Sequence, residues 1–378
     1  MTKEKVFLFL FLVLIVFIFT KFGLARILID KERAEFFFKD SAKNINFKKY
    51  PSYIKGIYIN SWTAGNQSKM AHLLNLIKET ELNAVVIDIK EVDGKIAFDT
   101  TSQLIKKLGT EEILIPNLKN LIRQLHQENV YAIARIVVFK DGTLPKIKPE
   151  LALKNKSGSL WQDWKGKTWL DPTSKEVWDY HIEIAKEAVK IGFDEINFDY
   201  VRFPSDGDIS KIVYPAWDNQ TSKPEIVREF FEYLNKELKP LGTFLSVDLF
   251  GLTMVREDDM NIGQILENAI PYFDFICPMV YPSHYPPDFE GYKNPADYPY
   301  EIITMNLAKG KERIGNAETM PTGRQAKLRP WLQDFNLGAI YDKKMIELEK
   351  QAVYDTNSYG WLLWNPSNRY TEEALEKD

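Results

Sequence analysis

The chain has 378 residues, of which 45% are hydrophobic and 13% aromatic, so it can bury a large core and is not a disordered segment. Its formal net charge of −4 and isoelectric point near 5.8 do not suit a broad phosphate-binding surface, which argues against nucleic acid as a partner. Cys277 is the only cysteine, so neither an intramolecular disulfide nor a multi-cysteine metal site can form.

The amino terminus has the pattern of a membrane-targeting segment. Lys3 and Lys5 precede an uncharged apolar run at residues 6–19, as in a secretory signal. Residues 22–27 offer a poor cleavage site, and the run is shorter than the roughly 20 residues of a full span. We therefore expect residues 1–27 to be an uncleaved signal-anchor helix, with a cleaved signal peptide or a buried core helix as the alternatives.

The segment at residues 28–50 mixes charged and aromatic residues without a sustained period, which is typical of a tether. A signal-anchor followed by a tether predicts that residues 51–378 lie outside the cytoplasm, held at the membrane. With a cleaved signal the same residues would be secreted.

Eight short segments have the pattern of buried strands. They are residues 55–60, 84–91, 131–139, 195–204, 244–250, 273–281, 328–335 and 360–364. Helical periodicity separates many of them, at residues 68–80, 117–128, 171–191, 224–238 and 343–354. Eight strands that alternate with helices close into a barrel, so the expected fold class is α/β, a (β/α)8 TIM barrel over residues 51–378. The runner-up is an open doubly wound sheet, but no Gly-rich phosphate turn follows the first strand.

Polar residues alternate with apolar ones near the ends of these strands. The outward face of a barrel strand packs on helices, so the polar face should point inward. The residues expected to ring the barrel mouth are Asn60, Asp88, Lys90, Arg135, Asn197, Asp199 and Asp248. Carboxylates and cations in one concave site shift one another's proton affinity, which acid–base chemistry uses. For Arg135 and Lys90, ion pairs that hold Asp88 or Asp199 in place are the alternative to substrate contact.

Two long segments follow strands, at residues 140–170 and 204–224. The first contains Trp161, Trp164 and Trp169. Loops after strands lie on the catalytic face of a barrel, so these indoles could form a platform for a sugar. The alternative is a small core that folds the loop back onto the barrel. No pair of histidines has metal-ligand spacing, so we expect neither a metal site nor a cofactor.

Five phrases of the sequence together resemble a bacterial family of glycoside-hydrolase-like domains. They are DIKEVDG at 88–94, ARIVVFKD at 134–141, GFDEINFDYVRFP at 192–204, CPMVYPSHY at 277–285 and RPWLQDF at 329–335. The resemblance extends over most of residues 54–370 and implies a TIM barrel that acts on glycosidic bonds outside the membrane, without specifying a substrate. Asn197 and Cys277 stand where Gln and Ser would be expected, and neither change involves the carboxylates.

The favoured function is hydrolysis of an extracellular or cell-wall polysaccharide by two carboxylates. The resemblance to barrel hydrolases implies Asp199, on the fourth strand, as the nucleophile and Asp248 as the acid/base, with Asp88 or Asp334 as substitutes for the second carboxylate. A non-catalytic barrel that binds carbohydrate or the cell wall is the alternative.

Substrate contacts are expected from two further groups. The cationic side chains would position hydroxyls or ionised groups of the substrate; they are Arg135, Lys90 and Arg202. The ring side chains would shape the sugar subsites; they are Tyr281, His284, Trp331 and Trp364. The expected substrate-binding residues are Asn60, Asp88, Lys90, Arg135, Asn197, Arg202, Tyr281, His284, Trp331 and Trp364.

Overall fold

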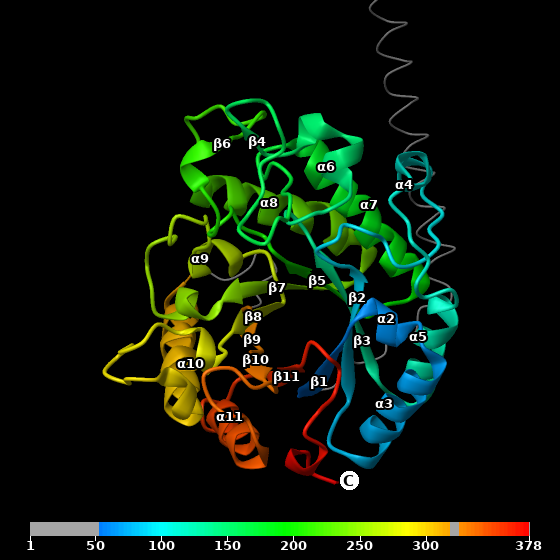
Figure 1. Ribbon diagram of the computed structural model, residues 1–378. Helices are drawn as coiled ribbons and strands as arrows, with labels where there is room; N and C mark the ends of the chain where they lie inside the picture. Colours follow the sequence, from blue (N-terminus) through cyan, green and yellow to red (C-terminus); the bar gives the residue numbers. More distant parts are fainter. Residues whose placement is uncertain (1–52, 318–324, 378) are drawn as a thin grey trace, which may run out of the picture. The chain divides into compact units, whose positions relative to one another are not determined.

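Parallel strands form a closed barrel surrounded by helices (Figure 1). Around the ring the strands are β1 (Ile54–Ile59), β2 (Ala84–Lys90), β3 (Tyr131–Val137), β5 (Glu195–Asp199), β7 (Phe244–Phe250), β8 (Phe275–Met279), β9 (Lys327–Leu328) with β10 (Trp331–Gln333), and β11 (Gly360–Trp364). The pairing of β11 with β1, and of Trp331 in β10 with Met279 in β8, closes the ring. The predicted (β/α)8 barrel is confirmed.

The computed structural model describes residues 53–317 and 325–377. The signal or signal-anchor expected at residues 1–27 and the tether expected at residues 28–50 lie outside the described residues. Within the described ranges, no helix has both the length and the apolar character needed to cross a membrane.

The helices outside the ring are amphipathic and follow the strands in order (Figure 1). The longer ones are α3 (Gln67–Glu79), α5 (Leu118–Gln127), α7 (Lys175–Ile191), α8 (Lys223–Leu238), α10 (Pro299–Asn316) and α11 (Lys343–Asp355). Helix α10 was not among the predicted helices, although Ile303, Leu307 and Ile314 have helical spacing and are buried. Short helices in the connections are α2 (Ser61–Ala64), α4 (Gln103–Leu108), α6 (Leu144–Ile147) and α9 (Leu266–Ala269).

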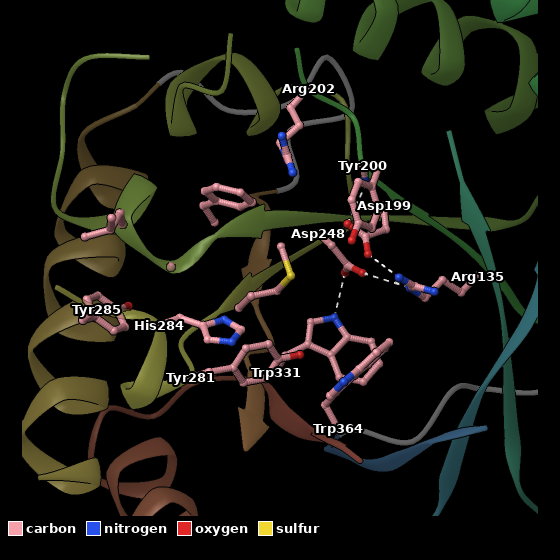
Figure 2. A pocket seen from close by; sticks show the side chains of 14 residues that line it. Arg135, Asp199, Tyr200, Arg202, Asp248, Tyr281, His284, Tyr285, Trp331 and Trp364 are labelled. Carbon is pink, nitrogen blue, oxygen red and sulfur yellow. Dashed lines mark hydrogen bonds and ion pairs between the residues drawn. The ribbon is translucent and has the colours of Figure 1, made fainter. Parts of the chain in front are cut away.

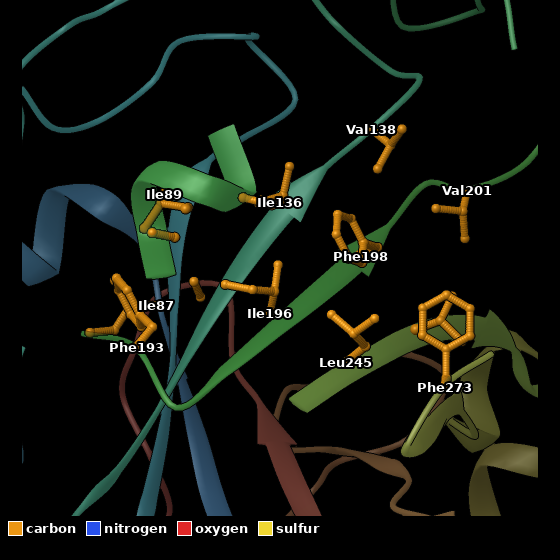
Figure 3. Close-up of a cluster of buried hydrophobic side chains, with 14 of the residues drawn as sticks. Ile87, Ile89, Ile136, Val138, Phe193, Ile196, Phe198, Val201, Leu245 and Phe273 are labelled. Atoms are coloured by element: carbon orange, nitrogen blue, oxygen red, sulfur yellow. The ribbon is translucent and has the colours of Figure 1, made fainter. Parts of the chain in front are cut away.

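The hydrophobic core lies between the strands and the helices. Figure 3 shows Ile196 and Phe198 of β5 in this layer, together with Ile136 of β3 and Ile87 of β2. Because side chains alternate along a strand, the neighbours of these residues point into the barrel. The alternation read from the sequence therefore matches the observed division into a packing face and a polar face.

Two strands differ from their predicted spans for identifiable reasons. The fourth strand ends at Asp199 rather than at residue 204, because Tyr200 adopts a left-handed backbone with φ of +54°. The seventh is divided into β9 and β10. Pro330 lies between the two pieces and has no N–H to donate to a ladder.

The two long loops predicted after the third and fourth strands pack on each other. Strand β4 (Lys154–Asn155) of the first pairs with β6 (Ile212–Val213) of the second. Trp161 and Trp169 are buried, and Trp161 Nε1 donates to the carbonyl oxygen of Asp208 at 3.0 Å. Trp164 is 76% exposed. Two of the three indoles thus belong to a loop core, and only Trp164 presents its ring to solvent.

Candidate active site

A cavity of about 570 Å³ opens at the carboxyl ends of the strands (Figure 2). Asp199 ends β5, Asp248 lies near the end of β7, and Trp364 ends β11. Eight of the twelve predicted site residues line the cavity: Arg135, Asp199, Arg202, Asp248, Tyr281, His284, Trp331 and Trp364. This end of the barrel is where TIM-barrel enzymes place their active sites.

Arg135 connects three carboxyl groups at the base of the cavity. Its Nη1 donates to Asp88 and its Nη2 donates to Asp199. Its Nε lies 3.7 Å from Oδ2 of Asp248, beyond hydrogen-bonding distance (Figure 2). Burial by itself would lower the pKa of Arg135, but the charges of Asp88 and Asp199 hold that pKa well above its usual value. The cation therefore stays charged and fixes both partners.

Asp248 is a buried carboxyl group with an altered proton affinity. Its Oδ1 accepts hydrogen bonds from Asn197 Nδ2 at 2.9 Å and from Trp331 Nε1 at 2.8 Å. Burial, followed by the negative charge of Asp199, raises the pKa of Asp248 to about 8. A carboxyl with its pKa raised in this way holds its proton toward neutral pH, which is a property that a general acid needs.

Asp199 occupies a different environment one strand away. Its Oδ2 accepts from Arg135 and its Oδ1 accepts from the backbone N–H of Tyr200 at 2.6 Å. Both oxygens of Asp199 thus accept hydrogen bonds, one from a cation and one from the backbone. The two neighbouring carboxyl groups therefore have opposed environments, which is the usual basis of acid and base roles.

Asp88 and Asn197 lie behind the cavity wall. Asp88 accepts from Tyr58 Oη at 2.5 Å and from Arg135. Burial raises the pKa of Asp88 to about 7, against the lowering effect of Arg135. Asn197 donates to both Ser246 and Asp248. Both residues position cavity groups rather than line the cavity themselves.

Lys90, Asn60 and Asp334 are placed outside the cavity. Lys90 is fully buried, and its Nζ lies 2.7 Å from the carbonyl oxygen of Val137 and 2.8 Å from Asp141. The pairing of β2 with β3 changes register between Asp88 and Lys90, so the strict alternation that would place both side chains on the same face is interrupted there. Asn60 caps α2 by accepting from the N–H of Thr63. Asp334 accepts from the N–H and the hydroxyl of Thr371.

Aromatic side chains form the wall opposite the acids. The rings of Trp331 and Trp364 meet edge to face with centroids 5.5 Å apart. Tyr58 stacks on Trp364 at 3.8 Å, and Tyr281 meets His284 edge to face. Such rings offer apolar faces to the C–H groups of a pyranose.

The sequence analysis missed several lining residues, namely Tyr200, Phe250, Gly251, Leu252, Met279 and Tyr285. Phe250 has the same parity as Asp248, so alternation contained a signal for it. Gly251 had no such signal. A Cβ there would lie 2.3 Å from Oη of Tyr285 and 2.6 Å from the carbonyl oxygen of Met279, so only glycine fits.

A metal site has no ligand set among the described residues. Within residues 53–317 and 325–377, no three His, Cys, Asp or Glu side chains are grouped so that they could hold a metal ion.

The chain belongs to the family described as "putative glycosyl hydrolase domain", which matches residues 56–370. No curated protein matches the chain. Membership of this family confirms the resemblance that the five sequence phrases indicated.

Solved structures with the same fold include several glycoside hydrolases. The PgaB (BpsB) glycoside hydrolase domain from Bordetella bronchiseptica has a TM-score of 0.61 at 14% identity, covering 86% of this chain and 98% of that one. The exo β-N-acetylglucosaminidase of Vibrio harveyi has a TM-score of 0.55 at 12% identity, covering 86% and 54%. The α-galactosidase of Thermus thermophilus, solved with p-nitrophenyl α-D-galactopyranoside, has a TM-score of 0.51 at 12% identity, covering 86% and 61%. At these identities the likeness shows the fold alone.

Proposed function

We propose that this protein is a glycosidase that hydrolyses an extracellular or cell-wall polysaccharide, with Asp248 as acid/base and Asp199 as nucleophile. The observation that carries the proposal is the pairing of a protonated Asp248 with a donor-bound Asp199 in an aromatic-lined cavity at the catalytic end of a barrel. Membership of a glycosyl hydrolase family supports the reaction class.

The proposed reaction has two steps. Asp248 gives its proton to the glycosidic oxygen as the bond from that oxygen to the anomeric carbon breaks, and an oxygen of Asp199 bonds to the anomeric carbon. Asp248, now ionised, then takes a proton from water, and the resulting hydroxide displaces Asp199 and releases the sugar. Arg135 keeps Asp199 in place throughout.

The strand register favours this retaining course over an inverting one. Strands β5 and β7 pair with Asn197 level with Ser246 and Phe198 level with Val247, so Asp199 continues to the level of Asp248. Neighbouring strands lie about 4.8 Å apart. Retaining enzymes need their two carboxyl groups about 5 Å apart, whereas inverting enzymes leave a wider gap for water.

The first test is release of reducing sugar from a panel of polysaccharides, followed by NMR of the anomer that forms first. Asp248→Asn should lower turnover of natural glycans about 10²- to 10⁴-fold, and lower turnover of an aryl glycoside much less, because a good leaving group needs no acid. Asp199→Asn should abolish both activities. Asp334→Asn, at a strand end outside the cavity, is the matched control and should keep activity. Turnover by Asp248→Asn within about tenfold of wild type on natural glycans would refute its role.

A non-catalytic sugar-binding barrel is the second candidate. It is favoured by the engagement of both oxygens of Asp199, one by Arg135 and one by the N–H of Tyr200, which leaves the carboxylate less free to attack. Oligosaccharide binding without any turnover on the panel would select this reading.

We propose further that the barrel is exported and held at the membrane by residues 1–27. The support is the sequence pattern alone, in which Lys3 and Lys5 precede the apolar run at residues 6–19. Amino-terminal sequencing of the native protein tests the anchor. A mature terminus between Gly23 and Arg33 would refute the anchor but leave export intact.

A further inference from the structure

Arg202 is a buried cation that faces the cavity. Its side chain lines the cavity, and the residue is only 6% exposed. Nη1 donates to the carbonyl oxygen of Phe203 at 3.0 Å and to Oγ of Ser205 at 3.1 Å. Figure 2 shows the guanidinium pointing from the loop toward the cavity that Asp199 and Asp248 also line.

The rest of the guanidinium lacks a partner. Among residues 53–317 and 325–377, no carboxylate lies within 4 Å of Arg202, and neither its Nε nor its Nη2 makes a hydrogen bond. Arg135, in the same cavity, is equally buried and is bound by both Asp88 and Asp199. The contrast shows that one cation of the cavity is neutralised by the protein and the other is not.

Aromatic rings surround Arg202 without replacing a counter-ion. The guanidinium carbon lies 5.0 Å from the ring centroid of Trp169, 5.3 Å from that of Tyr200 and 4.7 Å from that of Phe250. Aromatic faces attract a cation more weakly than a carboxylate does, so these contacts offset only part of the cost of burying the charge. Burial lowers the pKa of Arg202 below its usual value, despite the longer-range attraction of Asp199 and Asp206.

The loop backbone holds Arg202 in this position. On a continuing strand, Arg202 would lie on the opposite face from Asp199, since their numbers differ in parity. The left-handed Tyr200 between them breaks that alternation and turns Arg202 toward the cavity. Strain of this kind persists where the surrounding structure maintains it, which is common at functional sites.

We propose that Arg202 binds a carboxylate of the bound glycan, so that the preferred substrate contains an acidic sugar. The free Nε and Nη2 form a planar fork that matches the two oxygens of a carboxylate. This inference deepens the proposed function by assigning the substrate class of the same cavity. The carboxylate could belong to a hexuronic acid or to the lactyl ether of a muramic acid, and the two sources are separate arms of the test.

The test is calorimetric binding of four probes to the full-length protein. Two are acidic, a hexuronic acid tetrasaccharide and an N-acetylglucosamine–N-acetylmuramic acid tetrasaccharide, and two are their methyl esters, which keep the shape without the charge. Wild type should bind at least one acid tenfold or more tightly than its ester, and the arm with the larger ratio identifies the source. Arg202→Gln should remove the preference by weakening the acid alone. Arg202→Lys should keep part of the preference, because it retains charge without the fork.

The control is Arg256→Gln, at an arginine on the surface that pairs with Asp258. Arg256→Gln should leave the ratio of acid affinity to ester affinity unchanged for both pairs of probes. Melting curves confirm that each variant is folded. Equal binding of acid and ester by wild type overturns the inference, as does an Arg202→Gln variant that loses affinity for both alike. If Arg202→Gln does not fold, the acid-to-ester affinity ratios of the wild type still test whether the cavity prefers an acidic sugar.

Turnover of the same probes separates this inference from the proposed function. A tenfold preference for the acid without any product means that the hydrolase assignment fails while the role of Arg202 stands. Hydrolysis of neutral glycans with no preference for acids means that the hydrolase assignment stands while the proposed role of Arg202 fails.

Discussion

The indole Nε1 of Trp331 donates to Oδ1 of Asp248 at 2.8 Å, across the barrel mouth from β10 to β7. The donor favours the ionised form of Asp248 and so acts against burial, which raises the pKa of Asp248. Trp331 therefore contributes to the aromatic wall and also influences the proton affinity of Asp248, the proposed acid.

Trp331→Phe should move the alkaline limb of the pH–rate profile upward, by up to about one pH unit. Loss of the donor destabilises ionised Asp248 and raises its pKa above the present value of about 8. Because the proposed acid acts in its protonated form, activity should then persist to higher pH. The measurement is kcat/KM against pH. A limb that moves downward would contradict the assignment of Asp248 as acid.

The pH dependence of stability should change in Asp248→Asn. The carboxyl of Asp248 has a pKa of about 8 in the fold against 3.8 as a model value, so the folded state binds the extra proton between these limits. Its contribution to the free energy of unfolding is fully present below pH 4 and is lost as the pH rises to about 8, by at most about 1.4 kcal/mol per pH unit.

Denaturant unfolding from pH 4 to pH 9 measures this effect. The slope of stability against pH should be less negative in Asp248→Asn than in wild type. Asp288→Asn, at an exposed carboxyl, should leave the slope unchanged. Parallel curves for wild type and Asp248→Asn would mean that Asp248 is ionised throughout.

Lys90→Met should destabilise the fold by about 3–5 kcal/mol, since it leaves the buried carboxylate of Asp141 without its ion pair. The double variant with Asp141→Asn should recover part of the loss, because no uncompensated charge then remains. In the folded protein KM should stay within about twofold of wild type. A large rise in KM with unchanged stability would instead support the substrate contact read from the sequence.

Trp164→Ala should weaken oligosaccharide binding about 5- to 30-fold, the loss expected of one stacking ring, and leave the melting temperature within a few degrees. Trp164 is exposed on the loop that follows β3, at the end of the barrel where the cavity opens. Trp161→Ala should instead cost about 3–5 kcal/mol of stability. Unchanged affinity in Trp164→Ala would end the sugar-platform reading.

Strand identity and strand face were decided by the sequence itself. Alternation has a period of two and depends only on neighbouring residues, so Asp88, Arg135, Asn197, Asp199 and Asp248 could be placed on the inner face before any fold was known. The five phrases identified the family for the same reason, since they are local patterns.

The geometry beyond the strand ends was decided by the tertiary structure. The ion pair of Lys90 with Asp141 and the contact of two distant loops that buries Trp161 depend on residues far apart in sequence. The left-handed backbone of Tyr200, which turns Arg202 toward the cavity, breaks the alternation from which the sequence was interpreted. The proton on Asp248 likewise depends on its burial and on the charge of Asp199 from the neighbouring strand. Local pattern determines which face a side chain takes, whereas its partners and its charge state depend on contacts that only the closed barrel creates.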